Sequence, residues 1–273
     1  FDAWNWEDAA IKVDDGIHMN WPNSFTRGRW WLGEDPAMKA NKNYGKEIEN
    51  INHFIAQSKA YLKGDKSKTN LAYKAMKGLY DGSKTLFVNV DDEKGIIDAV
   101  NFKNENNINK MVIVGGYHAV KVADLLKSNN IPVLAQRVHK TPSSNDDDYD
   151  YPFKLAKLLV DKGVLVGLEN SGDMERANTR NLPFQAGTIA AYGLDKEEAL
   201  KLITSNTAKI LGLDKQLGTL ETGKDATLFI SEGDALDMRT NILTHAFING
   251  REISLETHQT NLWKRYSNKY KSN

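Results

Sequence analysis

The fold is decided by four short apolar runs: TLFV at residues 85–88, MVIV at 111–114, IPVLA at 131–135 and VLVGL at 164–168. Amphipathic segments, predicted to be helices, lie between them at residues 92–104, 117–128 and 153–161. Fully apolar strands that alternate with helices predict a parallel sheet covered on both faces. The functional residues of such a sheet lie at the carboxyl ends of its strands, in an open sheet and in a closed barrel alike.

The segment before these runs is aromatic and helical. Helices are predicted at residues 41–63 and 68–80, where apolar residues recur every three to four positions. The aromatic rings of this segment must be buried somewhere, and we favour packing in a core or an interface over a platform for sugar binding. The first 35 residues hold five of the six tryptophans of the chain: Trp4, Trp6, Trp21, Trp30 and Trp31.

A different pattern follows residue 168. Asp195 is a predicted helix N-cap, and Asn249-Gly250 predicts a hairpin turn. Residues 256–273 form a polar tail in which Trp263 and Tyr266 are candidate docking points. The predicted elements are helices at 184–192, 195–204 and 206–211 and strands at 226–230 and 245–248.

The composition excludes several classes of protein. The chain has 36 basic and 36 acidic side chains, a balance that argues against nucleic-acid binding by bulk charge and against a polybasic membrane-surface module. It has no cysteine, which excludes a disulfide framework, a thiolate nucleophile and a cysteine zinc site. No apolar run approaches the roughly 20 residues of a membrane helix. We expect a soluble protein, cytoplasmic or exported, without a nucleic-acid or membrane partner.

Three side chains near predicted strand ends are candidates for substrate binding. His118 begins the helix after the 111–114 strand, and His139 lies in the loop after the 131–135 strand. An ordinary cap or loop role is the alternative for each histidine. Arg180 follows the last predicted strand of the sheet, where it either orients a substrate carboxylate or bonds backbone carbonyls.

Other polar and glycine-containing segments have simpler interpretations. Gly115-Gly116 favours a tight turn over a phosphate cradle. Asp91-Asp92 favours capping of the following helix. The acidic run at 146–148 favours a solvated loop over a calcium site, because it lacks the spacing of an EF-hand.

Three stretches in order carry a resemblance to a known family: RNLPFQAG at 180–187, TSNTAKILG at 204–212 and GTLETGKDATL at 218–228. Together they resemble the C-terminal half of the amidohydrolase superfamily, in its imidazolonepropionase-like branch. The resemblance covers residues 84–254 well. It implies a (β/α)₈ TIM barrel with a small β-sandwich, and a metal-dependent hydrolase of carbon–nitrogen bonds.

The resemblance also implies a division of the chain. The four strand–helix units between residues 84 and 168 would be the second half of the barrel, and a whole barrel takes roughly 250 residues. We therefore expect a fragment, whose partner is the missing N-terminal portion of the same protein. The expected parts are 1–83 (aromatic-rich, helical, part of the barrel), 84–212 (barrel units and C-terminal helices), 213–255 (sandwich strands) and 256–273 (tail).

The family's metal ligands, placed on this sequence through the resemblance, are substituted. The histidine that ends the fifth strand is matched by Asn89, the sixth-strand histidine by Gly115-Gly116 and the eighth-strand aspartate by Ser171. An amide carbonyl is a poor ligand for a zinc-like ion, so we expect no metal ligand in this chain. The resulting candidates are substrate-binding Asn89, His118, His139 and Arg180, and catalytic Glu169 and Asp173.

Two functions stay open at this point. The first is a hydrolase of non-peptide carbon–nitrogen bonds with a metal-poor, degenerate site in this chain, zinc or a similar divalent ion being bound by the full-length protein. The second is a non-catalytic binding or assembly module that keeps the fold. An open doubly wound domain for a nucleotide or sugar is disfavoured by the motifs at 184–228. Either function implies a small-molecule substrate or ligand, and a homo-oligomer is compatible with both.

Overall fold

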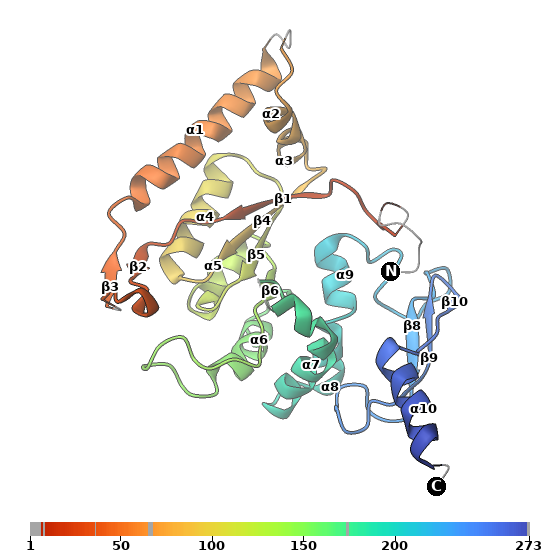
Figure 1. The fold of residues 1–273 in the computed structure, drawn as a ribbon. Coiled ribbons are helices and arrows are strands. Elements are labelled where there is room, and N and C mark those ends of the chain that lie inside the picture. The colour runs from red at the N-terminus through yellow and green to blue at the C-terminus, as the bar shows by residue number, and fades with distance from the viewer. Residues whose placement is uncertain (1–6, 8, 36, 65–67, 173–174, 272–273) are drawn as a thin grey trace.

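The computed structural model describes residue 7 and residues 9–35, 37–64, 68–172 and 175–271 of the chain. Its centre is a five-stranded parallel sheet in the order β1-β4-β5-β6-β7 (Figure 1). The predicted parallel sheet is confirmed, and all four predicted strands belong to it. The strands are β1 (Gly16–Asn20), β4 (Thr85–Val90), β5 (Met111–Gly115), β6 (Val133–Ala135) and β7 (Val166–Leu168).

Strand β1 is the member of the sheet that the sequence pattern does not predict. It pairs with β4 in parallel register, from Gly16 beside Thr85 to Asn20 beside Asn89. None of its five residues is fully buried, because it lies at an edge of the sheet. An edge strand of this kind lacks the continuous apolar run that marks the central strands. The sheet therefore reaches into the segment that was expected to be aromatic and helical.

One face of the sheet is covered by helices. Alternate strand residues, among them Leu86, Val88 and Ile113, pack on that face with Ile96 and Leu159 of the helices. The predicted helix at 68–80 is two short helices, and the one at 117–128 begins as a 3-10 turn. The helices and turns are α1 (Tyr44–Lys63), α2 (Leu71–Ala75), α3 (Lys77–Asp81), α4 (Glu93–Glu105), η2 (Ala119–Val122), α5 (Ala123–Ser128) and α6 (Tyr151–Asp161).

The opposite face of the sheet carries a smaller apolar cluster. Phe87, Val112 and Val114 point to this side and pack with Ile210 of helix α9 (Ser205–Leu211). His18 of β1 stacks on Phe87, with 4.8 Å between the ring centroids. The elements after β7 are η3 (Glu175–Asn181), α7 (Leu182–Ala191), α8 (Lys196–Lys201) and α9 (Ser205–Leu211). The predicted cap of α8 is confirmed, because Asp195 Oδ1 accepts hydrogen bonds from the amides of Glu197 and Glu198.

One tryptophan of the N-terminal segment, Trp21, packs in the main hydrophobic core. Trp21 is 5% exposed and donates its indole N–H to the Tyr44 hydroxyl at 3.0 Å. Trp31 is exposed, while Trp4 and Trp6 lie outside the described residues. Core packing is therefore the role of Trp21. The other elements of this segment are β2 (Phe25–Arg27), η1 (Trp30–Leu32) and β3 (Met38–Ala40), with β2 and β3 paired antiparallel.

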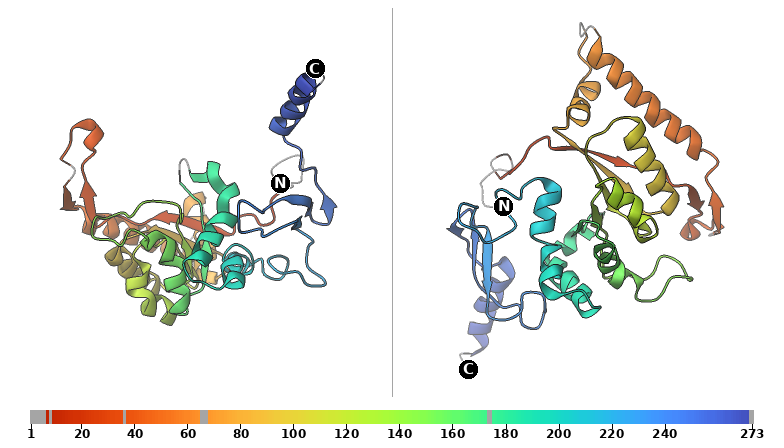
Figure 2. Two further views of the ribbon diagram at one scale, coloured as in Figure 1. Left: turned by 90° about the horizontal axis from the view of Figure 1, so that it is seen from below. Right: turned by 180° about the vertical axis from the view of Figure 1, so that it is seen from behind.

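A three-stranded antiparallel sheet and a last helix follow. The sheet contains β8 (Leu228–Ser231), β9 (Leu243–Ile248) and β10 (Arg251–Glu252). The predicted hairpin turn is present, with positive φ at Asn249 and Gly250. The expected polar tail contains helix α10 (His258–Lys271), which stands away from the rest of the chain in Figure 2. Trp263 is 64% exposed there.

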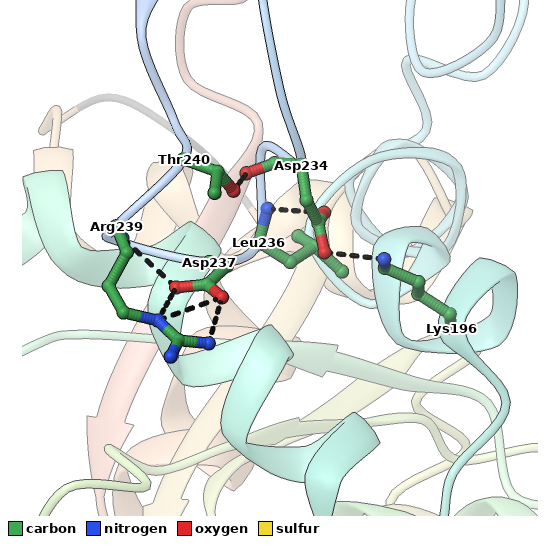
Figure 3. A network of polar contacts seen from close by, with 6 residues as sticks. All are labelled: Lys196, Asp234, Leu236, Asp237, Arg239 and Thr240. Carbon is green, nitrogen blue, oxygen red and sulfur yellow. Dashed lines mark hydrogen bonds and ion pairs between the residues drawn. The ribbon is translucent and has the colours of Figure 1, made fainter.

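A polar network fastens the β8–β9 connection to helix α8 (Figure 3). The Asp234 carboxylate accepts a hydrogen bond from the Leu236 amide at 3.0 Å and forms an ion pair with Lys196. Leu236 itself is buried in the main core.

Within the described ranges, no helix has the length and apolar character that crossing a bilayer requires.

Candidate functional site

A pocket of about 460 Å³ opens at the carboxyl ends of the parallel strands. Its walls come from the ends of β1, β4 and β5 and from the loops after β6 and β7. We call it the rim pocket. Its lining residues are Asn20, Trp21, Asn23, Asn89, Val90, Asp91, Val114, Gly115, Gln136, Arg137, Lys140, Glu169, Ser171 and Gly172.

Asp91 is the acidic residue that ties three loops together at this rim. Its Oδ1 accepts hydrogen bonds from the Tyr117 amide at 3.2 Å and from Gln136 Nε2 at 3.1 Å. Its backbone oxygen accepts a third, from the His118 amide at 2.9 Å. The interpretation of Asp91 as a helix cap is wrong. Asp92 alone caps α4, with Oδ1 accepting from the Gly95 amide at 2.9 Å.

Gly115 and Gly116 form a tight turn over Asp91. Both have positive φ, 93° and 67°, a conformation that side chains disfavour. A Cβ atom at Gly115 would lie 2.6 Å from Asp91 Oδ1. The Gly116 amide donates to the Val90 carbonyl at 2.9 Å. The turn interpretation therefore accounts for both glycines.

Lys140 reaches the rim pocket from the loop after β6. Its Nζ donates to Gln136 Oε1 at 2.7 Å and to Ser143 Oγ at 3.2 Å. It also lies 4.7 Å from the centroid of the Tyr117 ring. Burial lowers the pKa of Lys140, and the negative charge of Asp91 opposes that shift.

The long loop after β6 is held in place by Tyr117. The Tyr117 hydroxyl donates to Asp147 Oδ2 at 2.7 Å and accepts from the Ser143 amide at 3.0 Å. Tyr151 donates its own hydroxyl to the Tyr117 carbonyl at 2.7 Å. Burial raises the pKa of Tyr117, so its hydroxyl stays protonated and able to donate. Asp147 of the acidic run is thus an anchor of the loop.

Two of the predicted site residues line the rim pocket. Asn89 lines it from β4 and donates from Nδ2 to the Met19 carbonyl at 3.4 Å. Glu169 lines it from the loop after β7, where its carboxylate accepts a hydrogen bond from the Ser171 amide.

The other predicted site residues lie elsewhere. His118 precedes η2, next to the rim, and burial, with Lys121 nearby, lowers its pKa. His139 is exposed, with Nε2 2.8 Å from Thr188 Oγ1. Arg180 belongs to η3. Neither His139 nor Arg180 is among the described residues that line the rim pocket. Asp173 lies outside the described residues.

Sequence reasoning missed several residues of the pocket. They share one signal, which is a polar side chain at or just after the end of a strand. No motif marks them, and their grouping depends on which strands are neighbours in the sheet. The missed residues are Asn20, Asn23, Asp91, Gln136, Arg137 and Lys140.

The rim residues do not fit a zinc-like ion. Within the described ranges, no group of three or more His, Asp and Glu side chains is placed to bind a metal. Asn89 and Ser171 offer an amide and a hydroxyl, which are weak ligands for zinc. Asp91 Oδ1 already accepts hydrogen bonds from Tyr117 and Gln136. The pocket lining instead offers hydrogen-bond donors and acceptors.

Comparison with known proteins agrees with this fold. The sequence model of the amidohydrolase family matches residues 52–253. An imidazolonepropionase from Thermoplasma volcanium is 34% identical over 122 residues, which is 42% of this chain and 29% of that protein. The structure of an amidohydrolase from Thermotoga maritima MSB8 superposes with a TM-score of 0.72 at 23% identity, over 91% of this chain and 64% of that one. The chain thus spans under two thirds of the length of both relatives.

Proposed function

Because the chain belongs to the amidohydrolase family, we propose that its protein hydrolyses a non-peptide carbon–nitrogen bond in a small molecule. In this proposal the chain supplies the wall of the active site that binds the substrate. The observation that carries it is the rim pocket, which lies at the carboxyl ends of the parallel strands. Active sites of sheets and barrels of this kind are built there.

We further propose that the five parallel strands are part of a TIM barrel, with β8, β9 and β10 as strands of its small sandwich. The support is the superposition on the Thermotoga maritima amidohydrolase and the five-strand count of the described parallel sheet. A barrel of this type has eight strands. The remaining strands would come from another part of the protein.

Within the part of the active site that this chain supplies, Glu169 is the proposed proton acceptor. It lines the rim pocket directly after β7, and its carboxylate accepts a hydrogen bond from the Ser171 amide. Asn89 is the proposed contact to the substrate, since its amide lines the same pocket. A divalent ion, which amidohydrolases generally use, would take its ligands from outside the described residues.

Turnover of a substrate panel by the full protein tests this proposal. The panel includes imidazolonepropionate, cyclic amides and N-acyl amino acids, each assayed with and without added zinc. Glu169→Gln should lower kcat by about 10²–10⁴-fold, the usual contribution of a general acid or base. Glu105→Gln, on the exposed end of α4, is the matched control and should stay within about twofold of the parent. A Glu169→Gln enzyme with unchanged kcat would contradict the role of Glu169.

A second function has an observation of its own. Asn89, Gly115 and Ser171 stand in the rim pocket where the resemblance places metal ligands, which favours a module that binds a ligand without chemistry. Saturable binding of a panel member, with no turnover at any metal concentration, would support this function. Metal-dependent turnover by the unaltered protein would rule it out.

A further inference from the structure

Among the described residues, the ammonium group of Lys140 directly contacts only neutral groups, while the charges of Asp91, Asp147 and Arg137 act on its pKa without direct contact. Nζ donates to the Gln136 amide oxygen and to the Ser143 hydroxyl, and its remaining contact is the face of the Tyr117 ring. Within the part of the chain that the structure describes, no carboxylate forms an ion pair with it. Lys84, which is buried, is by contrast paired with Asp14.

The Gln136 amide lies between the Lys140 ammonium group and the Asp91 carboxylate. Its Oε1 accepts from Lys140 at 2.7 Å, and its Nε2 donates to Asp91 Oδ1 at 3.1 Å. Both ends of the amide are therefore in use, and the Lys140–Gln136–Asp91 chain fixes the direction of the lysine side chain. Lys140 and Asp91 both line the rim pocket, so this fixed ammonium group is presented to whatever occupies it.

A partly buried charge without a counter-ion costs free energy, and that cost is offset when a ligand brings the opposite charge. The ligand charge favoured here is a single negative one. The pocket lining contains two cationic residues, Arg137 and Lys140, and two carboxylates, Asp91 and Glu169. The two carboxylates would repel a dianion such as phosphate more strongly than a monoanion. Amide groups, which donate hydrogen bonds to a carboxylate, are supplied by Asn20, Asn89 and Asn23.

We propose that the rim pocket takes a substrate with a carboxylate group and that Lys140 is the residue that binds this carboxylate. The inference rests on the proposed function, because it names the substrate class of the same pocket. Lys140 is a specificity residue in this scheme.

Three probes of equal size test the charge preference: butyrate, butyramide and n-butylammonium. Each is titrated into the isotopically labelled protein at constant ionic strength, and the amide resonances of Tyr117, Gln136 and Ser171 are followed by NMR. Butyrate should shift them saturably and bind roughly tenfold or more tightly than butyramide, the size of a charge-assisted hydrogen bond. Equal affinities for butyrate and butyramide would overturn the proposal.

Two lysine variants assign the effect to one side chain. Lys140→Met should abolish the preference for butyrate, and Lys140→Arg should retain part of it because the charge is kept. Lys127→Met, at the opposite end of the sheet, should bind butyrate like the parent, and unchanged spectra elsewhere show that each variant is folded. A Lys140→Met protein that still prefers butyrate would overturn the proposal.

These outcomes distinguish the proposed binding of a carboxylate by Lys140 from the proposed hydrolase activity. The probe titration needs no turnover. An inactive protein that prefers butyrate through Lys140 would contradict the hydrolase activity and support the role of Lys140. If the protein is active and Lys140→Met leaves the KM for a carboxylate substrate unchanged, the role of Lys140 is contradicted and the hydrolase activity is supported.

Discussion

The two ends of the parallel sheet both open into cavities, and the two linings differ. The amino end has the larger cavity, of about 670 Å³, whose lining combines apolar residues such as Leu126 and Ile131 with the lysines Lys110, Lys127 and Lys209. The carboxyl end has the rim pocket, of about 460 Å³, where amide, carboxylate and ammonium groups predominate. The lining at the strand starts is the more apolar of the two, and the lining at the strand ends is the more polar. The comparison teaches that polar lining, rather than volume, locates the candidate site.

The largest effect on stability is expected at the amino end. Leu126 is fully buried and lines the larger cavity, so Leu126→Ala should cost about 2–5 kcal/mol of unfolding free energy. Urea denaturation measures the loss, and butyrate titration should show unchanged affinity. A variant that keeps its stability but loses butyrate binding would reverse the roles assigned to the two ends.

A smaller effect on stability, together with loss of binding, is expected at the carboxyl end. Gly115→Ala places a Cβ atom 2.6 Å from Asp91 Oδ1 at a φ of 93°, which should cost about 1–3 kcal/mol. The displaced Asp91 would also release Gln136, so butyrate affinity should fall.

Gly223→Ala is the matched control for that variant. Gly223 has a φ of 95° with no atom within 4 Å of an added Cβ, so the backbone strain is shared and the contact is absent. Loss of butyrate affinity in both variants would show that strain alone explains the result.

The smallest effect is a pH dependence that arises near the rim. Burial lowers the pKa of His118 and of His139 in the folded protein, whereas unfolded histidine titrates near about 6.5. On acidification through that value, the unfolded chain takes up protons that the folded chain does not, so unfolding becomes easier. Urea denaturation at about pH 7.5 and 5.5 should therefore show lower stability at the acidic value.

The double variant His118→Gln/His139→Gln isolates this contribution. It should lose less stability between the two pH values than the parent does. His258→Gln, on the exposed helix α10, should follow the parent. A double variant with the full pH dependence of the parent would assign the effect to other groups.

Sequence reasoning reached β4 to β7 because these strands are largely buried and carry continuous apolar runs, and this holds even for β7, the other edge of the sheet, whose three residues are all buried. It missed β1, because an edge strand with His18 and Asn20 exposed has no such run. It also missed α10, whose Trp263 and Tyr266 are exposed and give no core-facing stripe.

The site was predictable only in part, for a related reason. Asn89 and Glu169 follow apolar runs directly and were therefore visible as strand-end residues. Gln136 and Lys140 lie in a loop whose path is set by Tyr117 and Asp147, through contacts between residues far apart in sequence. The role of Asp91 depends equally on Gln136, which is 45 positions away. Such tertiary hydrogen bonds leave no local pattern.

Hydrogen–deuterium exchange of the protein with and without butyrate tests most directly whether ligands bind at the carboxyl end. The account predicts slower exchange on binding in residues 89–91, 115–117, 136–140 and 169–172, which border the rim pocket. Residues 109–111 and 126–132, at the amino end, should exchange at unchanged rates. Protection at the amino end without protection at the carboxyl end would contradict the account.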